Sequence, residues 1–257
     1  MDCPSNKVIL GNCIDVMKEL PTSCIDLTIT SPPYDKLRDY SGYSFDFETT
    51  AKELYAITKQ GGIVVWVVGD SVVDGSESGT AFRQALFFKQ IGFNLHDTMI
   101  YAKEGSALPD PTRYGQRFEY MFVLSKGKPK TFNPIVDVLN KRFGEVKSNC
   151  TVREKDGITY PRATRVVPEY SRRSNIWSYL VGYMHTTKDK FAYKHPAMFP
   201  EALVKDHIIS WSNEGDLVFD PFAGSGTTLK VAKALNRAYL GVEISKEYYD
   251  LIMERLK

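Results

Sequence analysis

Residues 217–228 read LVFDPFAGSGTT, an apolar run that ends in an aspartate and a glycine-rich turn. The pattern predicts a buried strand over Leu217–Asp220 and, after the turn, a helix over Thr227–Leu235. Open α/β sheets bind ligands at this carboxyl edge, where glycines let the backbone approach the ligand and the helix start offers unpaired N–H groups. Gly224 and Gly226 are not followed by the third glycine of a dinucleotide-binding turn, which argues against a dinucleotide ligand.

Two acids mark the same predicted edge. Asp220 begins the turn as a fixed anion suited to an ammonium group, and Glu243 ends the next predicted strand, Tyr239–Glu243. An acid at the tip of the second strand is where ribose hydroxyls are bound in such folds. The two acids therefore predict contacts to an ammonium group and to a ribose, and the alternative is a plain tight turn.

A second motif follows another predicted strand, Ile25–Thr30, where the chain continues as Ser31-Pro32-Pro33-Tyr34. Two prolines fix φ and remove two N–H donors, so carbonyl groups project without donors beside them. With the Ser31 hydroxyl they form a cluster of acceptors, and Tyr34 adds a face for stacking. The motif suits a planar ring that carries an amino group, and the alternative is a turn with a packing tyrosine.

The rest of the chain alternates short apolar runs with segments of helical periodicity, which favours a mainly parallel sheet with helices on its faces. Further strands are expected at 8–10, 63–68, 94–102 and 117–125, and helices at 12–20, 49–59, 81–90, 200–212 and 246–256. The 257 residues are 43% hydrophobic and 25% charged, as in ordinary globular proteins.

Several classes of protein are disfavoured by the same sequence. The longest apolar run, residues 63–69, is far short of the roughly 20 residues that a membrane helix needs, and the first residues show no signal-peptide pattern. The four cysteines include no CxxC pair and no histidine at zinc-finger spacing. We therefore expect no metal site, reduced thiols and a cytoplasmic location.

Charge is distributed unevenly along the chain. Residues 126–194 carry 15 Lys and Arg against 6 Asp and Glu, a net charge of +9, while the rest of the chain sums to −7. A basic insert on a mildly acidic body indicates a module that binds a polyanion, and the alternative is a solvated surface.

Together, the two motifs resemble those of DNA methyltransferases that use S-adenosylmethionine to methylate exocyclic amines. The SPPY and DPFAGSGT segments match the catalytic and cofactor motifs of that family, and their order, with an insert between them, is that of the permuted β group. The segments GNCIDVMKELP, GGIVVWVVGD, KHPAMFPEAL and YLGVEIS extend the match across nearly all of the chain outside the insert. The resemblance implies a Rossmann-like fold with a mainly parallel seven-stranded sheet. It divides the chain into a catalytic half (1–125), a target-recognition insert (126–194) and a cofactor-binding half (195–257).

The resemblance also implies roles for individual residues. An aromatic amine is a poor nucleophile, and acceptors aimed at its hydrogens stabilise the charge that develops on nitrogen as it attacks. Ser31 and the Pro32 carbonyl are implied as these acceptors, with Pro33 beside them and Tyr34 stacked on a base flipped out of double-stranded DNA. The implied cofactor residues are Asn12, Cys13, His195, Pro196, Asp220, Pro221, Phe222, Ala223, Gly224, Ser225, Gly226, Thr227 and Glu243. The candidate DNA contacts are Arg113, Arg172 and Arg173.

The target base is the harder question. Ser31 in place of an aspartate, and HPAMFP at 195–200 in place of HPTQKP, favour cytosine-N4, with adenine-N6 as the alternative. Asn12 stands where the family often has an aspartate near the adenine of the cofactor, so that contact stays open. Enzymes acting on RNA or protein and a non-catalytic DNA-binding module are more distant alternatives. We expect a protein held at the nucleoid through DNA, and the sequence leaves open a homodimer and a companion restriction enzyme.

Overall fold

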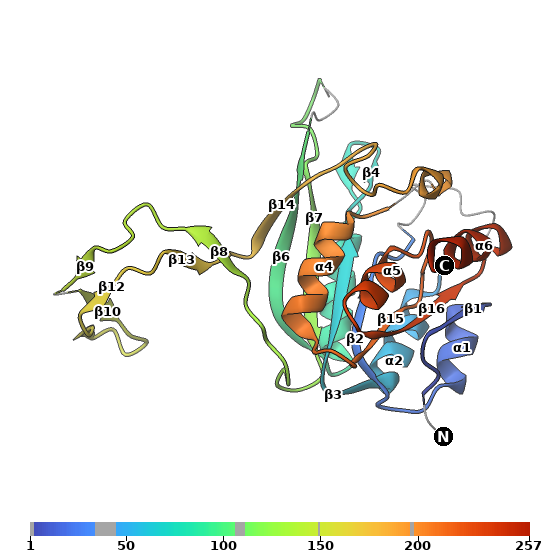
Figure 1. The fold of residues 1–257 in the computed structure, drawn as a ribbon, viewed down its shortest axis with the longest axis horizontal. Coiled ribbons are helices and arrows are strands. Elements are labelled where there is room, and N and C mark those ends of the chain that lie inside the picture. The colour runs from blue at the N-terminus through green and yellow to red at the C-terminus, as the bar shows by residue number, and fades with distance from the viewer. Residues whose placement is uncertain (1–2, 34–44, 106–110, 149, 196–197) are drawn as a thin grey trace. The chain divides into compact units, whose positions relative to one another are not determined.

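The computed structural model describes residues 3–33, 45–105, 111–148, 150–195 and 198–257. Eight strands form one sheet in the order β1–β16–β15–β2–β3–β7–β6–β14 (Figure 1). β7 runs antiparallel to both of its neighbours, and the other neighbouring pairs in this sheet are parallel. The bounds are β1 (Lys7–Leu10), β2 (Ile25–Thr30), β3 (Thr58–Val68), β6 (Asn94–Glu104), β7 (Phe118–Ser125), β14 (Ile176–Leu180), β15 (Leu217–Asp220) and β16 (Ala238–Glu243).

Helices cover both faces of the sheet, as the nearly continuous runs of buried residues in the central strands β2 and β3 require. The helices are α1 (Cys13–Glu19), α2 (Phe47–Ile57), α3 (Thr80–Gln90), α4 (Glu201–Trp211), α5 (Thr227–Ala234) and α6 (Lys246–Arg255). Buried side chains of α1, α2 and α3 share one core cluster with the strands, and side chains of α5 and α6 share another. α4 packs against α5. The α/β Rossmann-like class expected from the sequence is confirmed.

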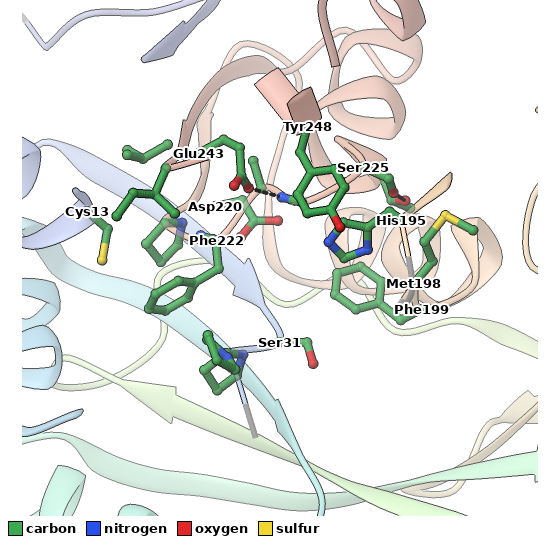
Figure 2. A pocket seen from close by; sticks show the side chains of 18 of the residues that line it. Cys13, Ser31, His195, Met198, Phe199, Asp220, Phe222, Ser225, Glu243 and Tyr248 are labelled. Carbon is green, nitrogen blue, oxygen red and sulfur yellow. Dashed lines mark hydrogen bonds between the residues drawn. The ribbon is translucent and has the colours of Figure 1, made fainter. Parts of the chain in front are cut away.

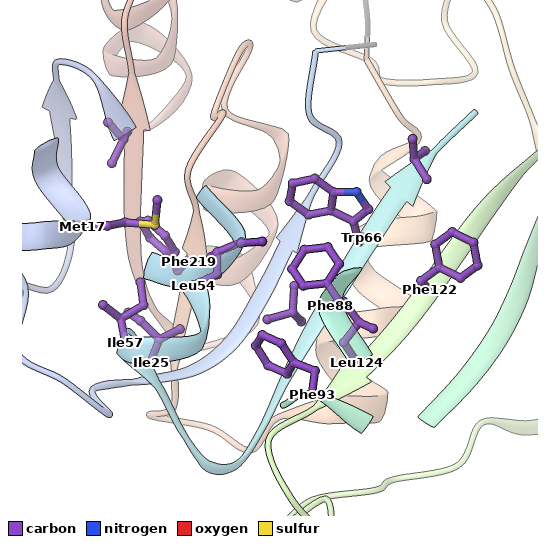
Figure 3. Close-up of a cluster of buried hydrophobic side chains, with 14 of the residues drawn as sticks. Met17, Ile25, Leu54, Ile57, Trp66, Phe88, Phe93, Phe122, Leu124 and Phe219 are labelled. Carbon is purple, nitrogen blue, oxygen red and sulfur yellow. The ribbon is translucent and has the colours of Figure 1, made fainter. Parts of the chain in front are cut away.

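The larger core centres on Trp66 in β3 (Figure 3). Val64, Trp66 and Val68 are two residues apart on the strand, so their side chains all point to the face that carries α2 and α3. The Trp66 ring lies 5.1 Å from the Phe88 ring, centroid to centroid, and its Nε1 donates to Gln84 Oε1 at 2.8 Å. The indole is therefore buried with its one polar group satisfied, which holds α3 against the middle of the sheet.

The sheet has one strand more than the seven expected. The additional strand, β14, comes from residues assigned to the insert and pairs in parallel with β6. Its inward side chains explain why: Trp177 packs against the buried His207 ring at 4.7 Å, and the Tyr179 hydroxyl donates to Asp206 at 2.7 Å. Two aromatic side chains spaced two residues apart thus bury one face of an edge strand.

The chain divides into two compact units, residues 1–133 with 175–257, and residues 134–174. The smaller unit is shorter than the insert expected at 126–194. It consists of two-stranded antiparallel ribbons, which pair β8 (Val136–Leu139) with β13 (Tyr170–Arg172), β9 (Val146–Lys147) with β12 (Arg165–Val166), and β10 (Thr151–Arg153) with β11 (Thr159–Pro161). Within its described residues only Val167 is buried, so this unit has almost no apolar core of its own.

The larger unit also contains a short antiparallel pair, β4 (Val72–Val73) with β5 (Ser76–Glu77), and a 3-10 helix, η1, at Lys190–Lys194. In the ranges that the structure describes, no helix has both the length and the apolar character of a membrane span.

Candidate active site

A cavity of about 380 Å³ lies at the carboxyl ends of β2, β15 and β16 (Figure 2). Both predicted motifs line it, although 190 residues separate them in sequence, because β2 and β15 are parallel neighbours. The Thr30 hydroxyl at the end of β2 donates to Asp220 Oδ1 at 2.7 Å, which joins the two strand ends directly. The predicted residues that line the cavity are Asn12, Cys13, Ser31, Pro32, Pro33, His195, Asp220, Pro221, Phe222, Ala223, Gly224, Ser225, Thr227 and Glu243.

Three predicted site residues, Gly226, Tyr34 and Pro196, are not among those that line the cavity. Gly226 does not line the cavity but stands at the start of α5 with a φ of +79°. A Cβ at this position would lie 2.9 Å from the Ile252 side chain, so a glycine lets the turn pack against α6. Tyr34 and Pro196 lie outside the described residues.

Asp220 is 2% exposed and points into the cavity (Figure 2). Burial raises the pKa of its carboxyl to about 6, and the charge of Glu243 acts in the same direction. Hydrogen bonds from Thr30 and from the Phe222 backbone N–H act against that rise. The carboxylate is therefore costly to keep charged in the folded protein, and a cationic group in the cavity would stabilise it.

Glu243, 7% exposed, ends β16 and fixes the two backbone segments beside it. Its Oε2 accepts from the Gly224 N–H at 2.7 Å, and its Oε1 accepts from the Ser245 N–H at 2.9 Å. Burial raises the pKa of this carboxyl as well. Because each carboxylate oxygen can accept more than one hydrogen bond, Glu243 keeps acceptor capacity toward the cavity.

The glycine turn leaves bare backbone on the cavity wall. Gly224 has a φ of +54°, and a Cβ there would lie 2.9 Å from His195 Nε2. The His195 ring packs edge-on against Tyr248, with 4.5 Å between centroids (Figure 2). Only a glycine therefore lets His195 close this wall.

Asn12 and Cys13 also line the cavity, at the start of α1. The Asn12 side chain accepts from the Ile14 N–H at 2.8 Å and so serves as the N-cap of that helix. Burial raises the pKa of the Cys13 thiol to about 11, so the thiol stays neutral at physiological pH. Neither side chain supplies a charge to the site.

Arg255 was missed by sequence reasoning and supports the glycine turn from behind. Its side chain is fully buried, and Nη1 donates to the Ser225 carbonyl at 2.7 Å and to Thr227 Oγ1 at 3.1 Å. Its other nitrogens pair with Asp189 at 2.9 Å and Glu201 at 2.7 Å. One arginine near the end of the chain thus ties α6 to the turn and to α4.

A second group that sequence reasoning missed lies on the antiparallel strands. Tyr101 and Lys103 of β6 and Glu119 of β7 line the same cavity as Ser31 and the prolines. Tyr101 and Glu119 are direct partners across the two strands. The two strands were expected from the sequence, but no local pattern indicated that they pair beside the cavity. The remaining unpredicted lining residues include Phe45, Thr50, Met198, Phe199 and Tyr248.

The three candidate DNA-contacting arginines are not among the residues that line the cavity. Arg172 is exposed, whereas Arg173 pairs with Asp137, donating from Nε at 2.9 Å and 3.0 Å. Arg113 donates to the Gly75 carbonyl at 2.7 Å. The unit at 134–174 carries nine Lys and Arg against five Asp and Glu, so less than half of the expected charge of +9 belongs to it. The rest lies in flanking segments that fold with the larger unit.

Comparison with known proteins identifies the family. The model of the N6/N4 methyltransferase family, described as DNA methylase, matches residues 25–254. The orphan methyltransferase M.BamHII of Bacillus amyloliquefaciens is 56% identical over 245 residues, which cover 94% of this chain and 92% of that protein. The DNA adenine methyltransferase YhdJ of Escherichia coli (strain K12) is 27% identical over 261 residues, covering 97% and 82%.

Solved structures agree with this assignment at the level of the fold. The PvuII DNA methyltransferase, described as cytosine-N4-specific, superposes with a TM-score of 0.70 at 20% identity, covering 100% of this chain and 88% of that one. Structures with the same fold include complexes with S-adenosylmethionine. Because the family model spans most of the chain and one relative exceeds half identity over nearly its whole length, this chain belongs to the N6/N4 family of DNA methyltransferases.

Proposed function

We propose that this enzyme transfers a methyl group from S-adenosylmethionine to cytosine N4 in double-stranded DNA, as a member of the permuted β group. The observation that carries the proposal is the single cavity that joins the acid-bearing glycine turn to the Ser31-Pro32-Pro33 acceptors. A methyl donor and a methyl acceptor must meet in one site, and the two motifs supply complementary halves of it.

The cofactor half fits S-adenosylmethionine by its chemistry. Asp220 supplies a buried anion for the ammonium of the methionine part, and Glu243 supplies acceptors for ribose hydroxyls. Gly224 offers backbone where a side chain would collide with His195. Asn12 and Cys13, at the start of α1, provide an uncharged wall for the adenine ring. The cavity also has the volume usual for sites that hold small molecules.

The acceptor half suits an exocyclic amine. When bound, S-adenosylmethionine supplies an electrophilic methyl group on a sulfonium. The Ser31 hydroxyl and the Pro32 carbonyl accept hydrogen bonds from the amine, which keeps the nitrogen lone pair directed away from them and stabilises the positive charge that develops. Tyr34 stacks on the base and compensates part of the cost of unstacking it from the duplex.

Two residues near the site are the reason for proposing cytosine rather than adenine as the target base. Ser31 is a neutral acceptor at the first catalytic position, and Phe199 stands where many adenine enzymes have a lysine. Adenine-N6 is the second candidate, because the family includes both activities by name and an adenine methyltransferase is among the relatives. Relatives named as type II methyltransferases suggest a companion restriction enzyme, whereas the relative at 56% identity is named an orphan methyltransferase.

DNA contact is assigned to the basic ribbons at 134–174 and to the segment around Arg113. Arg172 is the first choice, because it is exposed, whereas Arg173 is held by Asp137. Exposed Lys and Arg suit phosphates, which position the duplex without reading its sequence.

The deciding experiment is nucleoside analysis, by mass spectrometry, of plasmid DNA from cells that express the protein. We expect N4-methylcytosine in this DNA and none in DNA from cells that express a Tyr34→Ala variant. If the product is N6-methyladenine, the target base is adenine and not cytosine. If no methylated base is found although soluble protein is present, the proposed activity is contradicted.

A further inference from the structure

Lys103 and Glu119 form an ion pair in the wall of the cavity. Lys103 Nζ lies 2.5 Å from Glu119 Oε1, and the two side chains are 33% and 16% exposed. Both residues line the cavity with Ser31, Pro32 and Pro33. The ammonium also lies 5.7 Å from the centroid of the Tyr101 ring. In the strand order, β7 and β6 lie on the β2 side of the sheet rather than beyond β15 and β16, so this cation belongs to the half of the cavity wall that continues from Ser31.

The strand register sets this position. Tyr101 and Lys103 are two residues apart on β6 and so point to the same face, and Glu119 is the direct partner of Tyr101 on β7. The Tyr101 side chain is 3% exposed, and burial together with the charge of Glu119 raises the pKa of its phenol. The hydroxyl therefore stays protonated, and Lys103 is the charged donor on this wall.

Stability alone does not account for the pair. Ion pairs that are still in contact with solvent typically contribute about 0–1 kcal/mol, because solvent screens the attraction and two long side chains must be ordered to form the pair. The same sheet carries a closely similar pair far from the cavity, in which Lys59 Nζ lies 2.7 Å from Asp26 Oδ2 with side chains 41% and 13% exposed. The two pairs differ in what they face, and only the Lys103 pair lines the cavity.

The hydrogen-bond acceptors beside the amine of the target base are the groups that such a cation would bind. Beside its amine, cytosine presents two acceptors, the ring N3 and the carbonyl O2. Adenine presents one acceptor, N1, followed by a C–H group. An ammonium has three N–H donors, so Lys103 can keep its bond to Glu119 and still donate to the base. A flipped base is read along its Watson–Crick edge, and the second acceptor of cytosine gives a cation there one more hydrogen bond than adenine does.

We propose that Lys103, held in place by Glu119, donates hydrogen bonds to the acceptor edge of the flipped base and thereby selects cytosine over adenine. The inference rests on the proposed function, because it needs cytosine as the target. It makes Lys103 a residue that determines specificity and Glu119 a positioning residue.

The test compares Lys103→Met with Lys59→Met, which removes the lysine of the matched pair outside the cavity. The parent's methylated plasmid is sequenced to identify the recognition site. Synthetic duplexes then carry this site with cytosine or with adenine at the target position. Single-turnover methylation of each duplex is measured, together with the affinity for S-adenosylmethionine by calorimetry.

Lys103→Met should lower the rate on cytosine about 10- to 100-fold, the factor typical of a hydrogen bond to a charged group, and should lower the rate on adenine much less. Lys103→Arg should restore part of the rate on cytosine. Lys59→Met should leave both rates unchanged, and cofactor affinity should be equal to that of the parent in all three variants.

The inference is overturned if Lys103→Met leaves the cytosine rate unchanged or lowers the cytosine and adenine rates by the same factor. This result leaves the proposed function intact, because the parent still makes N4-methylcytosine. If the parent itself makes N6-methyladenine, the proposed target base falls and the inference falls with it, and this outcome is visible before any variant is made.

Discussion

Replacing Asp220 by asparagine should make the cofactor-free protein more stable while it removes cofactor binding. Asparagine keeps a carbonyl oxygen in place of Oδ1, which accepts from the Thr30 hydroxyl at 2.7 Å and from the Phe222 N–H at 3.1 Å. The substitution therefore removes the charge and keeps these two hydrogen bonds, while the third, from the Thr228 side chain, is the contact that the amide can alter. What changes is the free energy of holding an anion in a site that is 2% exposed.

The magnitude follows from the pKa of Asp220, which burial raises from 3.8 to about 6. A difference of about two units corresponds to about 3 kcal/mol. Between pH 4 and pH 6 the folded carboxyl retains a proton that the unfolded chain has released, so the folded state loses stability as pH rises through this window. Above pH 6 the full amount is lost, and below pH 4 none of it is.

Urea unfolding at several pH values, without cofactor, checks this prediction. The free energy of unfolding of Asp220→Asn should exceed that of the parent by about 3 kcal/mol at pH 7.5, and the gain should vanish near pH 3.5. Asp250→Asn, on the exposed face of α6, serves as a control and should show no such gain. A variant that is less stable than the parent at pH 7.5 would refute the reasoning that the charge is held at a cost. Calorimetry on the same samples should show loss of S-adenosylmethionine binding in Asp220→Asn alone.

Four further outcomes test other parts of the site. Glu243→Ala should weaken S-adenosylmethionine binding measured by calorimetry, because its oxygens accept from the hydroxyls of the ribose, and an unchanged affinity would contradict that role. Ser31→Ala should slow single-turnover methylation without changing cofactor affinity, with about 100- to 1,000-fold as the upper limit for one such contact, and a rate equal to the parent's would reduce the motif to a turn. Arg255→Met should lower the free energy of unfolding by about 3–5 kcal/mol, because it leaves buried partners unpaired. Lys230→Met breaks more exposed contacts to the same two acids and should lower it by about 1 kcal/mol or less. Equal losses of the two variants in urea unfolding would contradict this difference. Arg172→Ala should weaken DNA binding to all sequences and reduce the salt slope by about one unit, and an unchanged slope would place this arginine on a solvated face.

The local elements of this protein follow from its sequence alone. The strand, glycine turn and helix at 217–235 have the expected bounds to within one residue, and the strand that ends before Ser31 does as well. Asp220 and Glu243 stand at the tips of their strands as expected. These features depend on neighbouring residues, because apolar runs, prolines and glycines act on the backbone where they occur.

The segment at 126–194, expected from its charge to be one insert, does not fold as one unit. Its basic composition is visible in the sequence, but its compact unit covers 134–174, and β14 joins the main sheet. The reason is that Trp177 and Tyr179 find partners on α4, a helix that follows them by more than 20 residues. Composition records how many charges a segment carries and contains no information about which other segment buries its aromatic side chains.

Only the tertiary structure decides what meets across the cavity. The pairing of β6 with β7 places Lys103 beside Glu119, and the packing of α6 brings Arg255 behind the Ser225 turn. No periodicity or spacing marks these residues, since each looks like an ordinary surface charge in sequence. Their meaning depends on strand order and on contacts between distant segments, which are set by how the whole core packs, whereas each motif depends on the few residues that form it.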